Sequence, residues 1–182
     1  ILMIIKILSL LKILTITTIF TNKMNNLSAY SKKRNLKSSK EPEPKIKKSS
    51  KKLIYIIHEH RASHLHWDLR LEMNGVLKSW AIPKSPPLTK EMKRLAIQVE
   101  DHPLGYAKFE GIIPEGNYGA GKVIIWDNGT YELKDAEGDS CGKKSNKKIE
   151  FILHGKKLKG NYVLIKTNYG SKPEKSWLFF KI

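Results

Sequence analysis

The chain has 182 residues, with 34 Lys and Arg against 17 Asp and Glu, so its formal charge is +17. This length is enough for one domain with a hydrophobic core and a tail. The excess positive charge favours a polyanionic partner, most simply a nucleic acid, over a merely solvated basic surface. The single cysteine, Cys141, excludes an internal disulfide bond and any zinc site built on two cysteines of this chain. We therefore expect a protein of a reducing compartment, the cytoplasm.

Residues 1–23 open the chain with a hydrophobic segment. Ile and Leu dominate its first twenty positions, but Lys6 and Lys12 interrupt them and no A-x-A-like site follows. Such a segment fits neither a membrane span nor a secretory signal peptide. Because the chain begins with Ile and Met24 opens a polar stretch, we interpret residues 1–23 as an upstream extension with a misassigned start. An amphipathic helix on a membrane surface is the alternative.

Residues 24–52 are polar and rich in lysine. Ten of the 22 residues from Ser31 to Lys52 are Lys or Arg, and the sequence Glu-Pro-Glu-Pro at 41–44 cannot lie inside a helix. We predict a flexible basic arm. Its function is either to solubilise the chain or to lie along a phosphate backbone.

Residues 53–182 form a third segment, in which short β-rich runs alternate with turn signals. Nine strands are predicted, at Leu53–His58, Leu65–Met73, Val76–Ile82, Leu95–Val99, Lys122–Asp127, Thr130–Leu133, Lys148–Leu153, Asn161–Thr167 and Trp177–Ile182. Asn74-Gly75 and Asn128-Gly129 each predict a tight hairpin. No useful window has a helical apolar period, so the pattern predicts an all-β barrel or sandwich.

The predicted strand Leu65–Met73 carries the chemistry. Its alternation puts His66, Asp68, Arg70 and Glu72 on one face and apolar side chains on the other. His60 lies just upstream, and two histidines with an aspartate can hold a divalent metal. Arg70 can grip phosphate in a bidentate fork. A metal next to an arginine indicates phosphate-ester chemistry. His64 lies at a predicted turn, and we interpret it as a surface residue.

Further polar residues follow the predicted strands. His102, after an acidic pair, is a candidate metal ligand, phosphate donor or general acid, or it simply caps a turn before proline. Tyr106 could donate its hydroxyl to a phosphate oxygen. Lys84 and Arg94 flank strand ends, where a surface position is the simpler interpretation.

The glycine-rich run at 116–123 nearly matches a P-loop. Val123 replaces the magnesium-binding Ser or Thr, and a strand follows in place of a helix. We therefore interpret the run as a tight turn between strands and expect no nucleotide triphosphate.

With these motifs in place, the sequence from about Leu53 onward resembles the 3′-phosphoesterase module of bacterial DNA ligase D and its stand-alone relatives. The matching elements are His-x5-His-Trp-Asp-Leu-Arg-Leu-Glu at 60–72, Asn-Gly-x-Leu-Lys-Ser-Trp-Ala-Ile-Pro-Lys at 74–84, Lys-Arg-Leu-Ala at 93–96, Val-Glu-Asp-His-Pro-Leu-x-Tyr at 99–106, Phe-Glu-Gly-x-Ile-Pro-Glu-Gly-x-Tyr-Gly-Ala-Gly at 109–121 and Trp-Asp-x-Gly at 126–129. Several spaced motifs in one order are far more specific than any one alone.

The resemblance implies a compact β-barrel of about eight or nine strands that heals DNA 3′ ends with a divalent metal, typically Mn²⁺. It implies removal of a 3′-phosphate and trimming of a 3′-terminal ribonucleoside. The implied roles are metal binding by His60, His66 and Asp68, catalysis around the scissile phosphate by Arg70, His102 and Tyr106, and phosphate or DNA binding by Lys84, Arg94, Arg34 and Glu43. A protonated His102 would be the proton donor.

The resemblance also implies partners and one departure. The substrates would be DNA or RNA-tailed DNA 3′ ends, and ligase, polymerase and end-binding repair activities would come from separate proteins. In the arm, Arg34-Asn35 and the Glu-Pro-Glu-Pro run resemble the family's Arg-Asp and Pro-Glu-Pro elements, which serve ribonucleoside removal. Asn35 stands where the family usually has Asp, and the spacing to Glu43 is longer. The sequence therefore supports phosphate removal more strongly than trimming.

Two alternatives belong to other classes of protein. A non-haem iron oxygenase would use His66, Asp68 and a distal His102 as its iron ligands, but it leaves His60, Arg70 and the charge unexplained. A DNA-binding module without catalysis would rest on the basic arm. Its salt-sensitive binding would be unaffected by His60→Ala.

Overall fold

The computed structural model describes residues 27–49, 52–134, 148–170 and 172–182. The interpretations of residues 1–23 and of Cys141 therefore lie outside the described residues.

Within these ranges, no helix has the length and apolar character needed to cross a membrane.

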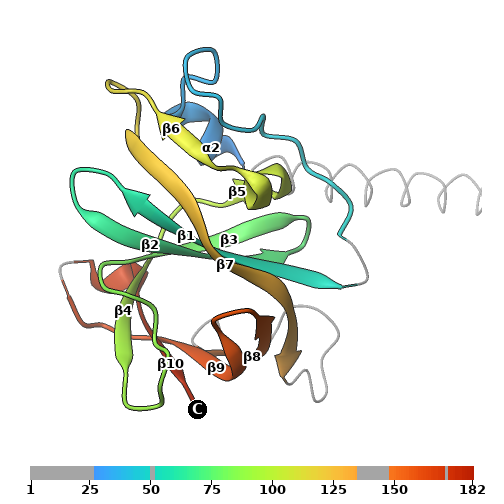
Figure 1. Cartoon of the computed structure of the whole chain (residues 1–182), viewed down its shortest axis with the longest axis vertical. Coiled ribbons are helices and arrows are strands. Elements are labelled where there is room, and N and C mark those ends of the chain that lie inside the picture. Colours follow the sequence, from blue (N-terminus) through green and yellow to red (C-terminus); the bar gives the residue numbers. More distant parts are fainter. Residues whose placement is uncertain (1–26, 50–51, 135–147, 171) are drawn as a thin grey trace, which may run out of the picture.

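Strands make up almost all of the regular structure (Figure 1). In chain order the elements are α2 (Ser28–Lys33), β1 (Leu53–Arg61), β2 (Leu65–Met73), β3 (Val76–Ile82), β4 (Lys93–Gln98), β5 (His102–Pro103), the 3₁₀ helix η1 (Leu104–Lys108), β6 (Gly111–Ile113), β7 (Gly121–Lys134), β8 (Lys148–Gly155), β9 (Lys159–Lys166), the 3₁₀ helix η2 (Pro173–Lys175) and β10 (Ser176–Lys181).

The strands close into an antiparallel barrel. Neighbours pair in the order β1-β2-β3-β4-β10-β9-β8-β7, and β7 returns to pair with β1. This closed circuit of eight strands confirms the predicted β-barrel, and closure removes the exposed edges that an open sheet would leave. β6 pairs with β7 and β5 with β3, both beside the circuit.

The alternation within β1 and β2 decides what lies on each side of the barrel wall. Leu69 and Leu71 face the inside, where they pack with Trp80, Phe151 and Phe179 in a fully buried core. Each such aliphatic side chain contributes about 1.5–3 kcal/mol by leaving water. The opposite parity faces outward, yet its residues are buried as well, because a second layer covers this part of the wall.

This outer layer consists of α2, β5, η1 and β6, which lie together on one side of the barrel in Figure 1. Its own apolar cluster joins Tyr30 of α2, Tyr106 of η1 and Ile113 of β6 to Val76 of β3 and Val123 of β7. The polar face of β2 is therefore enclosed between the barrel wall and the outer layer.

The basic arm takes part in this layer from residue 27 to residue 49. We predicted a flexible arm, but α2 forms and Tyr30 is completely buried, with its hydroxyl donating to the carbonyl of Pro42 at 2.7 Å. Leu27 is buried beside it. Leu36 and Ile46 pack against the same cluster. These few apolar side chains without a visible period suffice, because the barrel wall supplies the rest of the apolar surface.

One of the two predicted hairpins forms and the other does not. Asn74 and Gly75 have φ values of 53° and 80°, which is the left-handed pair that a tight hairpin requires. In contrast, β7 runs straight through Asn128-Gly129, so the predicted turn there is wrong. Gly129 serves a close approach: a Cβ atom at this position would lie 2.2 Å from the carbonyl oxygen of His154 on β8.

Candidate active site

The antiparallel pairing of β1 with β2 assembles a cluster of possible metal ligands. His60 lies opposite His66, and His58 lies opposite Asp68, all on the outward face of the wall. One ligand atom from each of His60, His66 and Asp68 falls within 4.8 Å of the others. The structure thus brings together the three residues for which the sequence predicted a metal.

Backbone carbonyls fix which nitrogen each histidine presents. His60 Nε2 lies 2.9 Å from the carbonyl oxygen of Gly119, and His66 Nδ1 lies 2.9 Å from that of His64. Both nitrogens must carry protons, because a carbonyl only accepts. In the neutral form of each ring, His60 Nδ1 and His66 Nε2 are then the unprotonated nitrogens, and a backbone partner on the other nitrogen is the usual second contact of a metal-binding histidine.

These two nitrogens face the Asp68 carboxylate without bonding to it. His60 Nδ1 is 3.7 Å from Oδ2, and His66 Nε2 is 3.9 Å from Oδ1. Both distances exceed a hydrogen bond, but ligands about 2.1 Å from a shared ion lie roughly 3–4 Å apart. Two imidazole nitrogens and a carboxylate suit a divalent transition metal, so the residues fit such an ion.

The carboxylate in this cluster is ionised. Burial alone would raise the pKa of Asp68, but the positive charge of the Arg70 guanidinium opposes this effect and holds that pKa below its ordinary value. The closest charge contact joins Arg70 Nη2 to Asp68 Oδ2 at 3.1 Å. Asp68 is therefore available as an anionic ligand.

Arg70 is held by all three of its nitrogens. Nη1 donates to Ser79 Oγ at 2.8 Å, Nη2 donates to Asp68, and Nε reaches His58 Nδ1 at 3.4 Å. Its guanidinium carbon lies 4.7 Å from the centre of the Tyr106 ring. A guanidinium has five N–H groups, so two remain for an anion in a fixed direction.

His58 supports this arginine as a neutral acceptor. Burial and the Arg70 charge lower the pKa of His58 to about 3, so the ring carries no charge near neutral pH. A second cation at this place would repel the guanidinium.

His102 is neutral in this arrangement as well. Its Nδ1 donates to the carbonyl of Glu100 at 2.9 Å, and its Nε2 lies 2.9 Å from Arg34 Nη2 and must accept. Burial, Arg70 and Arg34 together hold the pKa of His102 well below its usual range. The protonated imidazole that we expected is therefore absent from the unliganded protein, because two buried guanidinium groups disfavour a third cation.

The arm contributes Arg34 to the same cluster. Arg34 Nε lies 2.9 Å from Glu41 and its Nη1 lies 2.8 Å from Glu100. Its guanidinium also covers the Tyr30 ring at 4.1 Å. Tyr106, whose pKa burial raises, keeps its proton and donates to Glu41 Oε1 at 3.1 Å. The arm thus closes one side of the site.

Three of the predicted site residues lie outside these contacts. Glu43 pairs with Lys45 on the surface, and Glu41 enters the site in its place. Lys84 is exposed beyond the end of β3. Arg94 donates to the carbonyl of Ser85, in the loop that follows Lys84.

Sequence reasoning missed four residues that hold the site together. They are Glu41, His58, Ser79 and Glu100. His58 shares the parity of His60 on β1, and Glu100 belongs to the acidic pair before His102, so both had a visible signal. The Pro-rich run at 41–44 offers two glutamates, and the sequence does not indicate that Glu41 is the one that enters the site. Ser79 had none.

The geometry defines a class of site, namely a candidate metal centre beside a fixed arginine on the outside of an antiparallel barrel. The chain belongs to the DNA ligase D 3′-phosphoesterase domain family, whose model matches residues 58–166. This match includes the candidate ligands, Arg70, His102 and Tyr106, and it leaves the arm outside.

Full-length relatives agree with this family. The multifunctional non-homologous end joining protein LigD of Pseudomonas aeruginosa is 46% identical over 157 residues, which cover 85% of this chain and 18% of the relative. The corresponding repair protein of Mycobacterium tuberculosis is 45% identical over 143 residues, covering 78% and 18%. LigD of Mycolicibacterium smegmatis is 43% identical over 161 residues, covering 84% and 20%. The chain thus spans about a fifth of these relatives.

Proposed function

We propose that this chain is a metal-dependent 3′-phosphoesterase that removes a 3′-phosphate from DNA ends and leaves a 3′-hydroxyl. The observation that carries the proposal is the pair of histidines whose unprotonated nitrogens face Asp68, directly beside the fixed Arg70. Membership of the DNA ligase D 3′-phosphoesterase family supports it.

We assign the metal to His60, His66 and Asp68, with Mn²⁺ as the preferred ion because of the family resemblance. When bound, a divalent ion supplies Lewis-acid polarisation of a phosphate oxygen and lowers the pKa of a bound water. Arg70 would bind the phosphate through its two remaining N–H groups, in the orientation that Ser79 and Asp68 set. Donors that are already fixed lower the barrier without reorganisation.

His102 is the proposed proton donor to the leaving 3′ oxygen. It is neutral in the free protein, and a bound phosphate would raise its pKa because the phosphate adds negative charge nearby. Arg34 can then turn from His102 Nε2 to the phosphate, which frees that nitrogen for proton transfer. Tyr106 adds a neutral hydroxyl donor at the same place.

Ribonucleoside trimming is a second proposed activity, and the placement of the arm favours it. Arg34 and Glu41 both reach the site, although Asn35 is exposed and its side chain accepts from the backbone of Lys37. The arm can therefore contact the sugar of a terminal ribonucleotide without a carboxylate at position 35.

The proposed substrates are DNA and RNA-tailed DNA 3′ ends, and the proposed context is end joining. The relatives' printed names describe multifunctional non-homologous end joining proteins. Because this chain matches only a fifth of them, we assign ligase, polymerase and end-binding activities to separate partners.

A gel assay on a labelled primer–template with a 3′-phosphate tests the proposed activity. We expect conversion to a 3′-hydroxyl with Mn²⁺, none with chelator, and none with His66→Ala. His154→Ala is the matched control, because this exposed histidine lies on β8 and contacts Glu132. Loss of conversion in both variants, or conversion that survives chelation, would contradict the proposal.

A further inference from the structure

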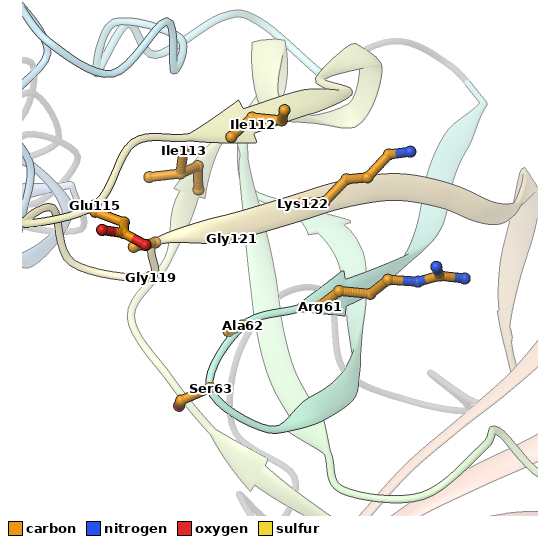
Figure 2. Close-up of a pocket in the computed structure, with 10 residues that line it drawn as sticks. Arg61, Ala62, Ser63, Ile112, Ile113, Glu115, Gly119, Gly121 and Lys122 are labelled. Atoms are coloured by element: carbon orange, nitrogen blue, oxygen red, sulfur yellow. The ribbon is translucent and has the colours of Figure 1, made fainter.

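A hollow of about 620 Å³, shown with its lining residues in Figure 2, adjoins the segment that positions His60 in the candidate metal centre. Its walls come from the end of β1 and the turn after it, from β6, from the glycine-rich loop and from the start of β7. Gly119 belongs to this wall, and its carbonyl holds His60 Nε2. The hollow and the metal centre therefore share one segment of backbone.

A row of four exposed side chains begins at this hollow, which three of them line, and ends beyond it on β2. The strand register places Ile112 of β6 opposite Lys122 of β7, Lys122 opposite Arg61 of β1, and Arg61 opposite Leu65 of β2. Ile112 is 70% exposed and Leu65 is 48% exposed. We call these four residues the rim row, and their order is apolar, basic, basic, apolar.

The side chains of the two cations, Arg61 and Lys122, make few stabilising contacts within the fold. Directly opposed like charges on neighbouring strands destabilise a sheet. The Lys122 side chain makes no hydrogen bond or ion pair with any residue in the described ranges, and the Arg61 side chain has only an exposed contact with Glu59 at 2.8 Å. Such exposed ion pairs contribute little. In Figure 2 both side chains extend from the same end of the hollow, and Glu115 lies toward the other end.

We propose that the rim row binds the sugar–phosphate backbone of the nucleic-acid strand upstream of its 3′ end. Arg61 and Lys122 contact phosphates, and Ile112 and Leu65 pack against sugars or bases on either side. Four strands at about 4.7–4.9 Å spacing span roughly 14 Å, which matches about four nucleotides at roughly 3.4 Å each. The assignment of a 3′ end rests on the proposed function, whereas the binding surface itself rests on the row.

The position of the rim row supports a nucleic-acid strand as its ligand. Arg61 follows His60 directly, and Leu65 directly precedes His66, so the row lies one residue beyond the candidate ligands at the tip of the β1–β2 hairpin, with its side chains on the opposite face of the two strands. A strand with its terminal phosphate at Arg70 must leave the site past one of its edges, and the arm closes another side. The net charge of +17 complements a polyphosphate.

The test compares two double variants of equal charge loss in the full chain. Arg61→Gln with Lys122→Gln removes the cations of the row, and Lys159→Gln with Lys166→Gln removes two exposed lysines from β9 as the control. Fluorescence anisotropy with a 3′-phosphate primer–template, without metal, gives the Kd over a range of salt. We expect the row variant to bind about tenfold more weakly or worse, and its log–log salt slope to fall by about 1 to 2.

Kinetics on the same preparations separate this inference from the proposed function. With Mn²⁺, the row variant should show a raised KM for the long substrate and lose its preference over a 3′-phosphorylated dinucleotide. If the wild type releases no phosphate, the proposed function fails while the binding comparison still decides the row. Equal Kd values and salt slopes in the two double variants would overturn the inference.

Discussion

At the scale of single residues, the site depends on protons whose positions the backbone fixes. Gly119, His64 and Glu100 each present a carbonyl to one histidine nitrogen, and each thereby decides which nitrogen is left unprotonated. His60 and His66 are set to bind a metal in this way. His102 is set to accept from Arg34 instead, which places it outside the ligand set that the iron-oxygenase alternative requires.

The protonation of His102 gives a first prediction. In the metal-free protein its ring should remain neutral, with the proton on Nδ1, at pH values where an ordinary histidine is charged. Nitrogen chemical shifts across a pH titration measure both properties. Arg34→Ala should raise the His102 pKa because it removes one of the two neighbouring cations. A ring that titrates near 6.5 in the wild type would contradict the assignment.

The same group has a consequence for stability. Its pKa is lower in the folded than in the unfolded chain, so the unfolded chain binds more protons at mildly acidic pH. Stability from His102 is therefore complete above about pH 6.5, the ordinary histidine value, and falls as the pH drops below it. Arg34→Ala should flatten this part of the curve in urea unfolding.

At the scale of elements, side chains spread along the arm hold it to the rest of the protein, including Leu27, Leu36 and Ile46 in the outer apolar cluster. Tyr30 is its fully buried anchor, and Arg34 and Glu41 attach it to the site. The arm has low apolar content, so its release should not require unfolding of the barrel.

A second prediction concerns this anchor. Tyr30→Ala removes a fully buried aromatic ring, a change that costs about 3–5 kcal/mol where the site cannot collapse. We expect hydrogen exchange to accelerate across residues 27–49 while the barrel strands stay protected. Tyr30→Phe should lose only the bond to Pro42, and Tyr169→Ala, at a residue 74% exposed, is the control. Unchanged exchange in Tyr30→Ala would show that the arm is held elsewhere.

A third prediction concerns the glycine that carries β7 past β8. A Cβ atom at Gly129 would meet the carbonyl oxygen of His154 at 2.2 Å and Cα of Gly155 at 2.9 Å, both backbone. Gly129→Ala should therefore lower the free energy of unfolding by about 1–3 kcal/mol. Gly116→Ala is the comparison, because a Cβ there meets nothing within 4 Å and only its φ of 80° is unfavourable. Urea denaturation measures both variants, and a neutral Gly129→Ala would contradict the close approach.

At the scale of the whole molecule, the alternation of apolar and polar residues predicted much of the fold. The bounds of β2 and β3 match the prediction because β2 has an apolar residue at every second position and the Asn74-Gly75 turn separates the two strands. The turn at Asn128-Gly129 was wrong because a local sequence cannot distinguish a glycine needed for a turn from one needed for a close approach. The packing of the arm was missed because its partner surface lies elsewhere in the sequence.

The candidate site also has one part that the sequence predicts and one part that it does not. His60, His66, Asp68 and Arg70 were predictable because two neighbouring strands carry them on one face. The network of Arg34 with Glu41, Glu100 and His102 was not. Its contacts between Arg34 and the residues around position 100 span 66 to 68 positions, and only the folded chain shows which glutamate of the Pro-rich run meets Tyr106.

The central claim is that an ion held by His60, His66 and Asp68 is needed for release of a 3′-phosphate. The measurement that tests it most directly follows phosphate release from a 3′-phosphate oligonucleotide while Mn²⁺ occupancy is determined on the same samples. We expect one site, a rate proportional to its occupancy, and loss of both in Asp68→Asn. Release that is independent of occupancy, or full occupancy and rate in Asp68→Asn, would contradict it.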